Sequence, residues 1–156
     1  MKQNIVGLIY TGERVDELQE LTRYRNTAAL PMVGRYRLID FTLANMIHSG
    51  IKNIGIIMQK NYHSLMDHLG SGREWNLHGK RSGLTILPPF MSRENVGVYD
   101  GLLDALHNNM NFMRRSVERN IVVTDSNVLY QVDFRDMMNH HLDNKADITL
   151  LYTKDR

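Results

Sequence analysis

The sequence predicts an α/β fold in which a mostly parallel sheet is flanked by helices. Short apolar runs with the length of buried strands alternate with segments whose apolar residues recur at helical spacing. This alternation favours a parallel sheet, because parallel strands need crossover connections that are usually helical. The 156 residues, 42% of them hydrophobic, are enough for one domain or part of a larger one.

The first third of the chain predicts a right-handed βαβ unit. Residues 5–9 form a continuous apolar run, as in a strand covered on both faces. Residues 38–49 carry an apolar stripe at helical spacing, and Gly50 is placed to end that helix. Residues 53–59 predict the second strand, which completes the unit. Before the helix, residues 28–31 are expected to be extended, since a residue preceding proline avoids the helical region.

Further strands and helices follow in alternation. We expect a short helix at 62–69, a strand at 84–87, one long helix at 101–115 with Leu103 among its inward residues, and a short buried strand at 120–124. Residues 134–142 predict a helix capped by Asp133, and residues 146–152 predict a last strand. No closing helix follows that strand, so the domain is expected to be truncated, as part of a larger subunit.

Composition narrows the function classes. A net charge of +2 is too small to indicate a nucleic-acid or membrane partner. The chain has no cysteine, which excludes disulfides and thiolate metal sites and fits a reducing compartment. Its N-terminus has no apolar stretch long enough for a secretory signal or a membrane span. We therefore expect a cytoplasmic protein.

Candidate site residues follow the predicted strands, because ligands of open parallel sheets bind beyond the carboxyl ends of the strands. Gly12 comes after the first strand, where the backbone N–H groups of a glycine-containing loop can hold a phosphate. Asp125 and Asn127 follow the strand at 120–124 and are candidates to hold a divalent cation. A turn stabilised by these side chains is an equally good interpretation.

A basic cluster is the other candidate. Arg23, Arg25, Arg35 and Arg37 lie within fifteen residues and have the chemistry to bind a phosphate bidentately. The alternative is a solvated basic face with Arg37 paired to Asp40 or another carboxylate, since most charge clusters are solvated. The seven histidines show no zinc-site spacing, and the sequence has no Walker loop and no Gly-x-Ser-x-Gly motif.

Several longer motifs identify a family resemblance. Residues 31–41, Pro-Met-Val-Gly-Arg-Tyr-Arg-Leu-Ile-Asp-Phe, resemble the P-F-G-G-K-Y-R-I-I-D-F signature of the glucose-1-phosphate adenylyltransferases, or ADP-glucose pyrophosphorylases. Residues 43–51, 68–77, 84–89 and 99–105 are similar to further motifs of that family. The resemblance implies a Rossmann-like nucleotidyltransferase domain of the GT-A type. Residues 1–156 would be its N-terminal part, with the rest of the domain and a C-terminal β-helix domain outside this chain.

The family makes ADP-glucose and pyrophosphate from ATP and glucose 1-phosphate, for glycogen or starch, with Mg²⁺. With this resemblance, the candidates for nucleotide or sugar-phosphate binding are Gly12, Arg14, Gly34, Arg35, Arg37, Gly101 and Asp125. Asp125 would also be the candidate Mg²⁺ ligand, two residues from the family's position.

The departures from the family pattern fall on the residues that act on the substrates. The family loop L-A-G-G-x-G-x-R-L is replaced by residues 8–15, which lack two of the three glycines. In it Tyr10, Thr11 and Glu13 would crowd or repel a triphosphate. The degenerate catalytic positions include Gly12 and Arg14 in this loop, Thr27 at the phosphate-facing lysine and Asn127 at the metal-binding aspartate, while Leu102 replaces a threonine.

Loss of these groups with survival of the framework resembles a GlgD-type regulatory subunit, which forms a hetero-oligomer with a catalytic adenylyltransferase subunit. On this interpretation the chain has little or no activity alone and requires no cofactor, and Mg²⁺ is needed only if the chain is active. Two alternatives remain: an active nucleotidyltransferase that uses Arg14, Asp125, Arg35 and Arg37 in an altered geometry, and a stand-alone module that binds a sugar-phosphate effector.

Overall fold

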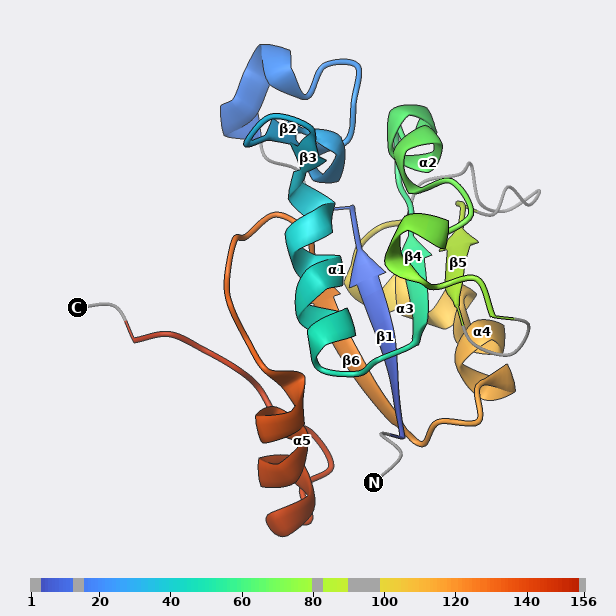
Figure 1. Cartoon of the computed structure of the whole chain (residues 1–156), viewed down its shortest axis with the longest axis vertical. Helices are drawn as coiled ribbons and strands as arrows, with labels where there is room; N and C mark the ends of the chain where they lie inside the picture. Colours follow the sequence, from blue (N-terminus) through green and yellow to red (C-terminus); the bar gives the residue numbers. More distant parts are fainter. Residues whose placement is uncertain (1–3, 13–15, 80–82, 90–98, 155–156) are drawn as a thin grey trace.

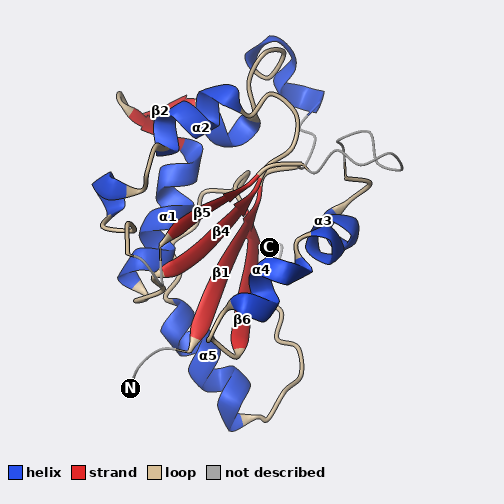
Figure 2. Cartoon of the chain, turned by 90° about the vertical axis from the view of Figure 1, so that its right-hand side faces the viewer, coloured by secondary structure: helices blue, strands red, loops and turns tan. Residues whose placement is uncertain are grey.

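A computed structural model describes residues 4–12, 16–79, 83–89 and 99–154. Its centre is a four-stranded parallel sheet with the order β5-β4-β1-β6 (Figures 1 and 2). The strands are β1 (Ile5–Tyr10), β4 (Asn53–Ile57), β5 (Leu84–Leu87) and β6 (Asn120–Asp125). The predicted α/β fold with a mostly parallel sheet is confirmed.

The strand β1 is buried along its whole length because it lies inside the sheet and is covered on both faces. Its side chains alternate between the two faces, as the pleat of a strand requires. Tyr10 is in register with Ile57 of β4 and with Asp125 of β6. The carboxyl ends of these three strands therefore lie side by side.

Helices cover the two faces of the sheet. On one face pack α1 (Leu38–His48), α2 (His63–Leu69) and the start of α5 (Phe134–Asp143), whose buried residues share one apolar cluster with Ile5 and Ile9. On the other face pack α3 (Leu102–Asn108) and α4 (Met110–Arg115), whose residues cluster with Leu8, Tyr10 and Ile57. Figure 2 shows α1 and the α3–α4 pair on opposite sides of the strands.

On the sheet face that α4 covers, Gly55 of β4 has no room for a side chain. A Cβ added to Gly55 would lie 2.7 Å from Cε1 of Phe112, 2.9 Å from Cδ2 of Leu8 and 3.0 Å from Cδ1 of Leu87. We expect Gly55→Ala to lower the free energy of unfolding by about 1–3 kcal/mol, because an overpacked core must shift. Urea denaturation measures this loss. Gly101→Ala is the matched control, since no atom lies within 4 Å of a Cβ there, and an equal effect of the two changes would contradict the packing argument.

The prediction of one long helix at 101–115 is wrong, because the segment forms two helices, α3 and α4, that meet at Asn109. The backbone of Asn109 has φ −102° and ψ 15°, and its side-chain amide donates to the carbonyl of Ala105 (2.8 Å) and to the hydroxyl of Tyr99 (3.1 Å). Such side-chain bonds compete with the helical backbone pattern. Leu103, predicted to point inward, is 82% exposed.

Two strand predictions are also corrected. The strand β6 was expected to be buried, but Ile121 and Val123 are 44% and 40% exposed. The cause is that the apolar cluster under α3 and α4 reaches β1, β4 and β5 and includes no residue of β6. Residues 146–152 form no strand and pair with no strand among the described residues. Figure 1 shows this segment leading away from the sheet beyond α5, with Ile148 80% exposed.

The segment before α1 also differs from the prediction. Residues 27–29 form a 3-10 turn capped by the side chain of Asn26, so only Leu30 and Pro31 of the predicted extended stretch are extended. A small hairpin follows, in which β2 (Pro31–Met32) pairs with β3 (Tyr36–Arg37). No helix in the described part of the chain has the length and hydrophobicity needed to span a membrane.

Candidate functional site at the carboxyl ends of the strands

The centre of the strand-end edge is filled by the side chain of Tyr10. Its hydroxyl accepts a hydrogen bond from Nε2 of Gln59 (3.2 Å), and the same Nε2 donates to the carbonyl of Tyr99 (3.1 Å). The backbone N–H of Tyr99 donates to Oε1 of Gln59 (3.4 Å). All three residues are at most 6% exposed. A buried polar network of this kind fixes the positions of its members.

Gly12 lies directly against this network. A Cβ added to Gly12 would lie 2.3 Å from Cζ of Tyr10 and 2.5 Å from Cγ of Gln59. Thr11, just before it, is buried and donates from its hydroxyl to the carbonyl of Ile57 (3.0 Å). Thr11, at the start of the predicted phosphate loop, is therefore hydrogen-bonded to β4. Arg14, the next candidate in this loop, lies outside the described residues.

At the end of β6 the side chain of Asp125 stabilises a turn. Its Oδ1 accepts a hydrogen bond from the backbone N–H of Asn127 (3.2 Å), which agrees with the turn interpretation of this stretch. Both polar atoms of the Asn127 amide are buried without a partner among the described residues, as are the hydroxyls of Ser126 and Thr42. Unpaired buried polar atoms are costly and often mark a place where water or a ligand binds.

The donors at this edge do not suit Mg²⁺. The ion takes oxygen ligands in octahedral geometry, usually several waters with one or two carboxylates and substrate phosphates. Asp125 supplies one carboxylate, already used in the turn, and Asn127 supplies a neutral amide. Across the described ranges, no three His, Asp or Glu side chains come together as metal ligands.

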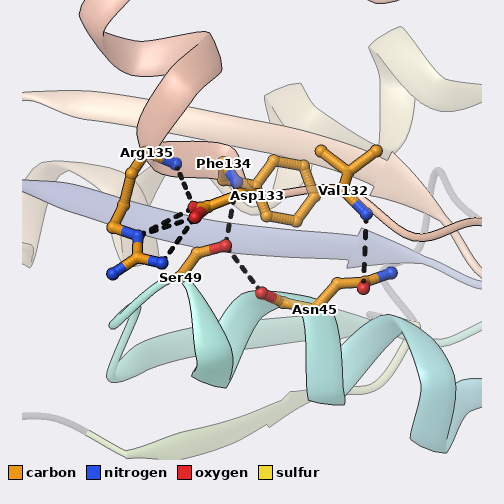
Figure 3. Close-up of polar contacts among 6 residues, drawn as sticks. All are labelled: Asn45, Ser49, Val132, Asp133, Phe134 and Arg135. Atoms are coloured by element: carbon orange, nitrogen blue, oxygen red, sulfur yellow. Dashed lines mark hydrogen bonds and ion pairs between the residues drawn. The ribbon is translucent and has the colours of Figure 1, made fainter.

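The loop after β6 is fixed on α1. The amide of Asn45 donates to the carbonyl of Tyr130 (2.8 Å). Figure 3 shows that the hydroxyl of Ser49 accepts from the backbone N–H of Phe134 (2.8 Å) and donates to the carbonyl of Asn45 (2.7 Å). The predicted cap Asp133 is confirmed, since it accepts from the backbone N–H of Arg135. Hydrogen bonds from the side chain of Arg135 lower the pKa of the Asp133 carboxyl to about 2.

The hydroxyl of Ser49, at the end of α1, binds the first turn of α5, so we expect its removal to destabilise this contact. In Ser49→Ala the backbone N–H of Phe134 loses its buried acceptor, and we expect a loss of about 1–3 kcal/mol in the free energy of unfolding. Hydrogen exchange of the amides of α5 should speed up more than that of β1. Ser71→Ala, at an exposed residue, is the control, and unchanged exchange in α5 would contradict this role of Ser49.

The arginine cluster does not form one anion site among the described side chains. The guanidinium of Arg37 donates to the carbonyl and hydroxyl oxygens of Ser64 (2.6 and 2.8 Å), not to the carboxylate that the sequence suggested. Arg35 lies over the ring of Tyr36, 5.7 Å from its centroid, and Arg23 lies 3.6 Å from a carboxylate oxygen of Glu20. Arg25 is exposed.

The remaining predicted positions are dispersed. Thr27 is buried in its 3-10 turn. Gly34 lies in the exposed turn of the β2–β3 hairpin with φ +78°, next to Val33, which also has a positive φ of 44°. A positive φ in a β-branched residue is strained, whereas glycine adopts it freely. Gly101 precedes α3.

A pocket beside the hairpin was not predicted from the sequence. It has a volume of about 690 Å³ and lies between the start of α1 and the end of α2, lined by Arg35, Tyr36, Asp40, Phe41, Ala44, His68, Glu74 and Trp75. In its wall Nε2 of His68 lies 2.8 Å from Oδ1 of Asp40, and the ring of Trp75 packs edge-on against the imidazole. Asp40 also accepts from the backbone N–H of Arg37 (2.8 Å), which fixes the start of α1. These residues lie within the family motifs at 31–41, 43–51 and 68–77, and this is the sequence signal by which the pocket could have been found.

Tyr130, in the loop after β6, is held by a hydrogen bond to the end of that strand. The hydroxyl of Tyr130 lies 2.5 Å from the hydroxyl of Thr124, and burial raises the pKa of this phenol. Taken together, the strand ends offer neutral hydrogen-bonding groups and one carboxylate. The described part of this arrangement can hold a neutral or weakly charged group, but it offers few positive charges to stabilise a transferring phosphate.

Comparisons with known proteins agree with the fold and the motifs. The family model of the nucleotidyl transferases matches residues 6–156. A glucose-1-phosphate adenylyltransferase of Bacillus cytotoxicus is 34% identical over 149 residues, covering 96% of this chain and 40% of that protein. The glycogen biosynthesis protein GlgD of Geobacillus stearothermophilus is 35% identical over 153 residues, covering 96% of this chain and 43% of that protein. The resemblance carried by the sequence motifs is confirmed.

The structural comparison supports the same architecture. A crystal structure of a protein assigned as a glucose-1-phosphate thymidylyltransferase from Bacillus anthracis superposes with a TM-score of 0.70 over 90% of this chain and 51% of that one. At 23% identity, this likeness shows the fold alone. The chain spans 40% and 43% of the length of the two curated relatives named above.

Proposed function

The chain belongs to the nucleotidyl transferase family, and from this premise we propose that it acts in glycogen biosynthesis as a regulatory subunit of a glucose-1-phosphate adenylyltransferase. In that reaction ATP and glucose 1-phosphate give ADP-glucose and pyrophosphate. The relatives support the substrate class, since they include both glucose-1-phosphate adenylyltransferases and a glycogen biosynthesis protein GlgD.

One observation carries the regulatory part of the proposal. The strand-end site holds a neutral Asn127 amide, and the nearby Asp125 carboxylate is engaged in a turn. Among the described residues, Arg23, Arg25, Arg35 and Arg37 form no cluster that would compensate for the missing charges. Phosphoryl-transfer chemistry depends on positioning and charge neutralisation, so a site without these groups has little to offer the transition state.

The proposal also covers the larger protein. Residues 1–156 would form the N-terminal part of a nucleotidyltransferase domain, with the rest of that domain and a β-helix domain elsewhere in the full subunit. The subunit would form a cytoplasmic hetero-oligomer with a catalytic adenylyltransferase subunit. A bound sugar phosphate or nucleotide would act as an effector and not as a substrate.

Coexpression with a catalytic subunit from the same organism tests this role. We expect the two proteins to elute together on size exclusion, and the complex to differ from the catalytic subunit alone in kcat or in KM for ATP. Calorimetry with ATP and glucose 1-phosphate on each subunit separates effector binding from catalysis. Absence of a complex, or a complex with kinetics identical to those of the catalytic subunit, would contradict the regulatory role.

A further inference from the structure

We propose that Tyr10 closes the strand-end site to nucleotides by occupying, with its own ring and hydroxyl, the place that a nucleobase would take. This inference rests on the proposed function, because it explains how a family member keeps the fold while its site is closed. It assigns a role to the side chain of Tyr10, which lies between the predicted site residue Asp125 on β6 and Ile57 on β4 and contacts Gly12.

The position of Tyr10 gives the first argument. It is the last residue of β1, which has β4 on one side and β6 on the other. Ligands of open α/β sheets bind in the crevice outside these strand ends. The ring of Tyr10 turns to the face covered by α3, where it packs with Ile57, Tyr99 and Ala105 and is only 5% exposed.

The hydrogen bonds of Gln59 give the second argument. A carboxamide has two N–H donors and one carbonyl acceptor, and it can pair with the edge of a nucleobase through both kinds of group. Here Nε2 is bound to the Tyr10 hydroxyl and to the Tyr99 carbonyl, and Oε1 is bound to the Tyr99 N–H. The Tyr10 hydroxyl therefore takes one of the two Nε2 donors of Gln59, and the Tyr99 carbonyl takes the other, so the buried amide has no free donor to offer a nucleobase.

The third argument is the close contact between Gly12 and Tyr10, which gives a reason for a glycine at this position other than phosphate binding. A Cβ at Gly12 would lie 2.3 Å from Cζ and 2.4 Å from the hydroxyl oxygen of Tyr10. No side chain larger than hydrogen fits there while the tyrosine ring stays in place. Gly12 is thus needed to accommodate Tyr10, and its retention does not require a bound phosphate.

The test compares the full-length protein with Tyr10→Ala and Tyr10→Phe, each first checked for folding by circular dichroism. Tyr10→Phe keeps the ring and loses only the hydroxyl, so it is the matched control. In calorimetry with ATP and with adenosine, the wild type and Tyr10→Phe should bind with dissociation constants in the millimolar range or weaker, and Tyr10→Ala should bind at least about 10-fold more tightly, about 1.4 kcal/mol. If Tyr10→Ala fails to fold, Tyr10→Val, which also lacks the ring, replaces it.

A second measurement needs no variant. Photolabelling of the wild type with an azido-adenosine should leave the peptides that contain residues 5–12 and 53–59 unlabelled. Labelling of these peptides, tight ATP binding by the wild type, or equal binding by all variants would overturn the proposal. Such a result would not affect the proposed regulatory role, which is judged by the change in kinetics of the catalytic subunit.

Discussion

The full-length protein alone should form ADP-glucose at least about 10³-fold more slowly than its catalytic relatives. Loss of one group that stabilises charge in the transition state commonly costs about 10²–10³ in rate. By the family resemblance, Thr27 and Asn127 would stand in place of two such groups, and we propose that Tyr10 closes the strand-end site. Because such losses are not additive, we state only a lower bound. A coupled assay for pyrophosphate release measures the rate.

Two variants separate this expectation from its alternative. Asp125→Ala should leave any residual rate unchanged, since the carboxylate serves a turn. Asn127→Asp should not restore activity, because a single carboxylate leaves the other positions altered. A rate close to that of the catalytic relatives, abolished in Asp125→Ala, would instead show an active enzyme with an altered site.

Leu43→Ala should destabilise the protein more than any surface change. Leu43 is fully buried on α1, in the apolar cluster that joins this helix to the sheet. Truncation of a buried leucine removes its transfer free energy and leaves a cavity, which together cost about 2–5 kcal/mol. Because α1 also carries the contacts of Asn45 and Ser49, the loop after β6 should loosen at the same time.

Urea denaturation with a tryptophan signal from Trp75 measures this loss. Val117→Ala, at a residue that is 85% exposed, is the control and should change the free energy of unfolding by less than about 0.5 kcal/mol. Similar midpoints for the two variants would contradict the assignment of the core to the interface between α1 and the sheet.

The sheet could be predicted from the sequence because its strands are covered on both faces. Continuous apolar runs such as 5–9 and 54–58 leave few alternatives once helical segments separate them. The caps Asp133 and Gly50 were also recognisable, since each acts within a few residues of sequence. Local signals of this kind do not depend on the rest of the fold.

The errors occurred where distant residues decide the outcome. The break at Asn109 depends on a hydrogen bond to Tyr99. The exposure of Ile121 depends on how far α3 and α4 reach across the sheet. Residues 146–152 have the pattern of a strand, but a strand needs a partner edge, and no described strand pairs with them.

The predicted strand ends gave the place of the candidate site, but not the side-chain contacts within it. The sequence indicated that Tyr10 would crowd a ligand, whereas its bond to Gln59 and its contact with Gly12 depend on the packed structure. For the guanidinium of Arg37 the sequence suggested either a phosphate or a carboxylate as partner, yet it binds Ser64, which lies 27 residues away in the sequence. Pairings of this kind follow from the tertiary arrangement and leave no local pattern.

The central claim is that this chain acts through a partner and does not itself transfer the nucleotidyl group. The most direct test assembles the wild-type protein with a catalytic subunit whose own active-site carboxylate has been replaced, and then measures ADP-glucose formation. We predict no rate above that of the inactivated subunit alone, although the complex forms. A restored rate that depends on the presence of this protein would contradict the claim and place a working active site in this chain.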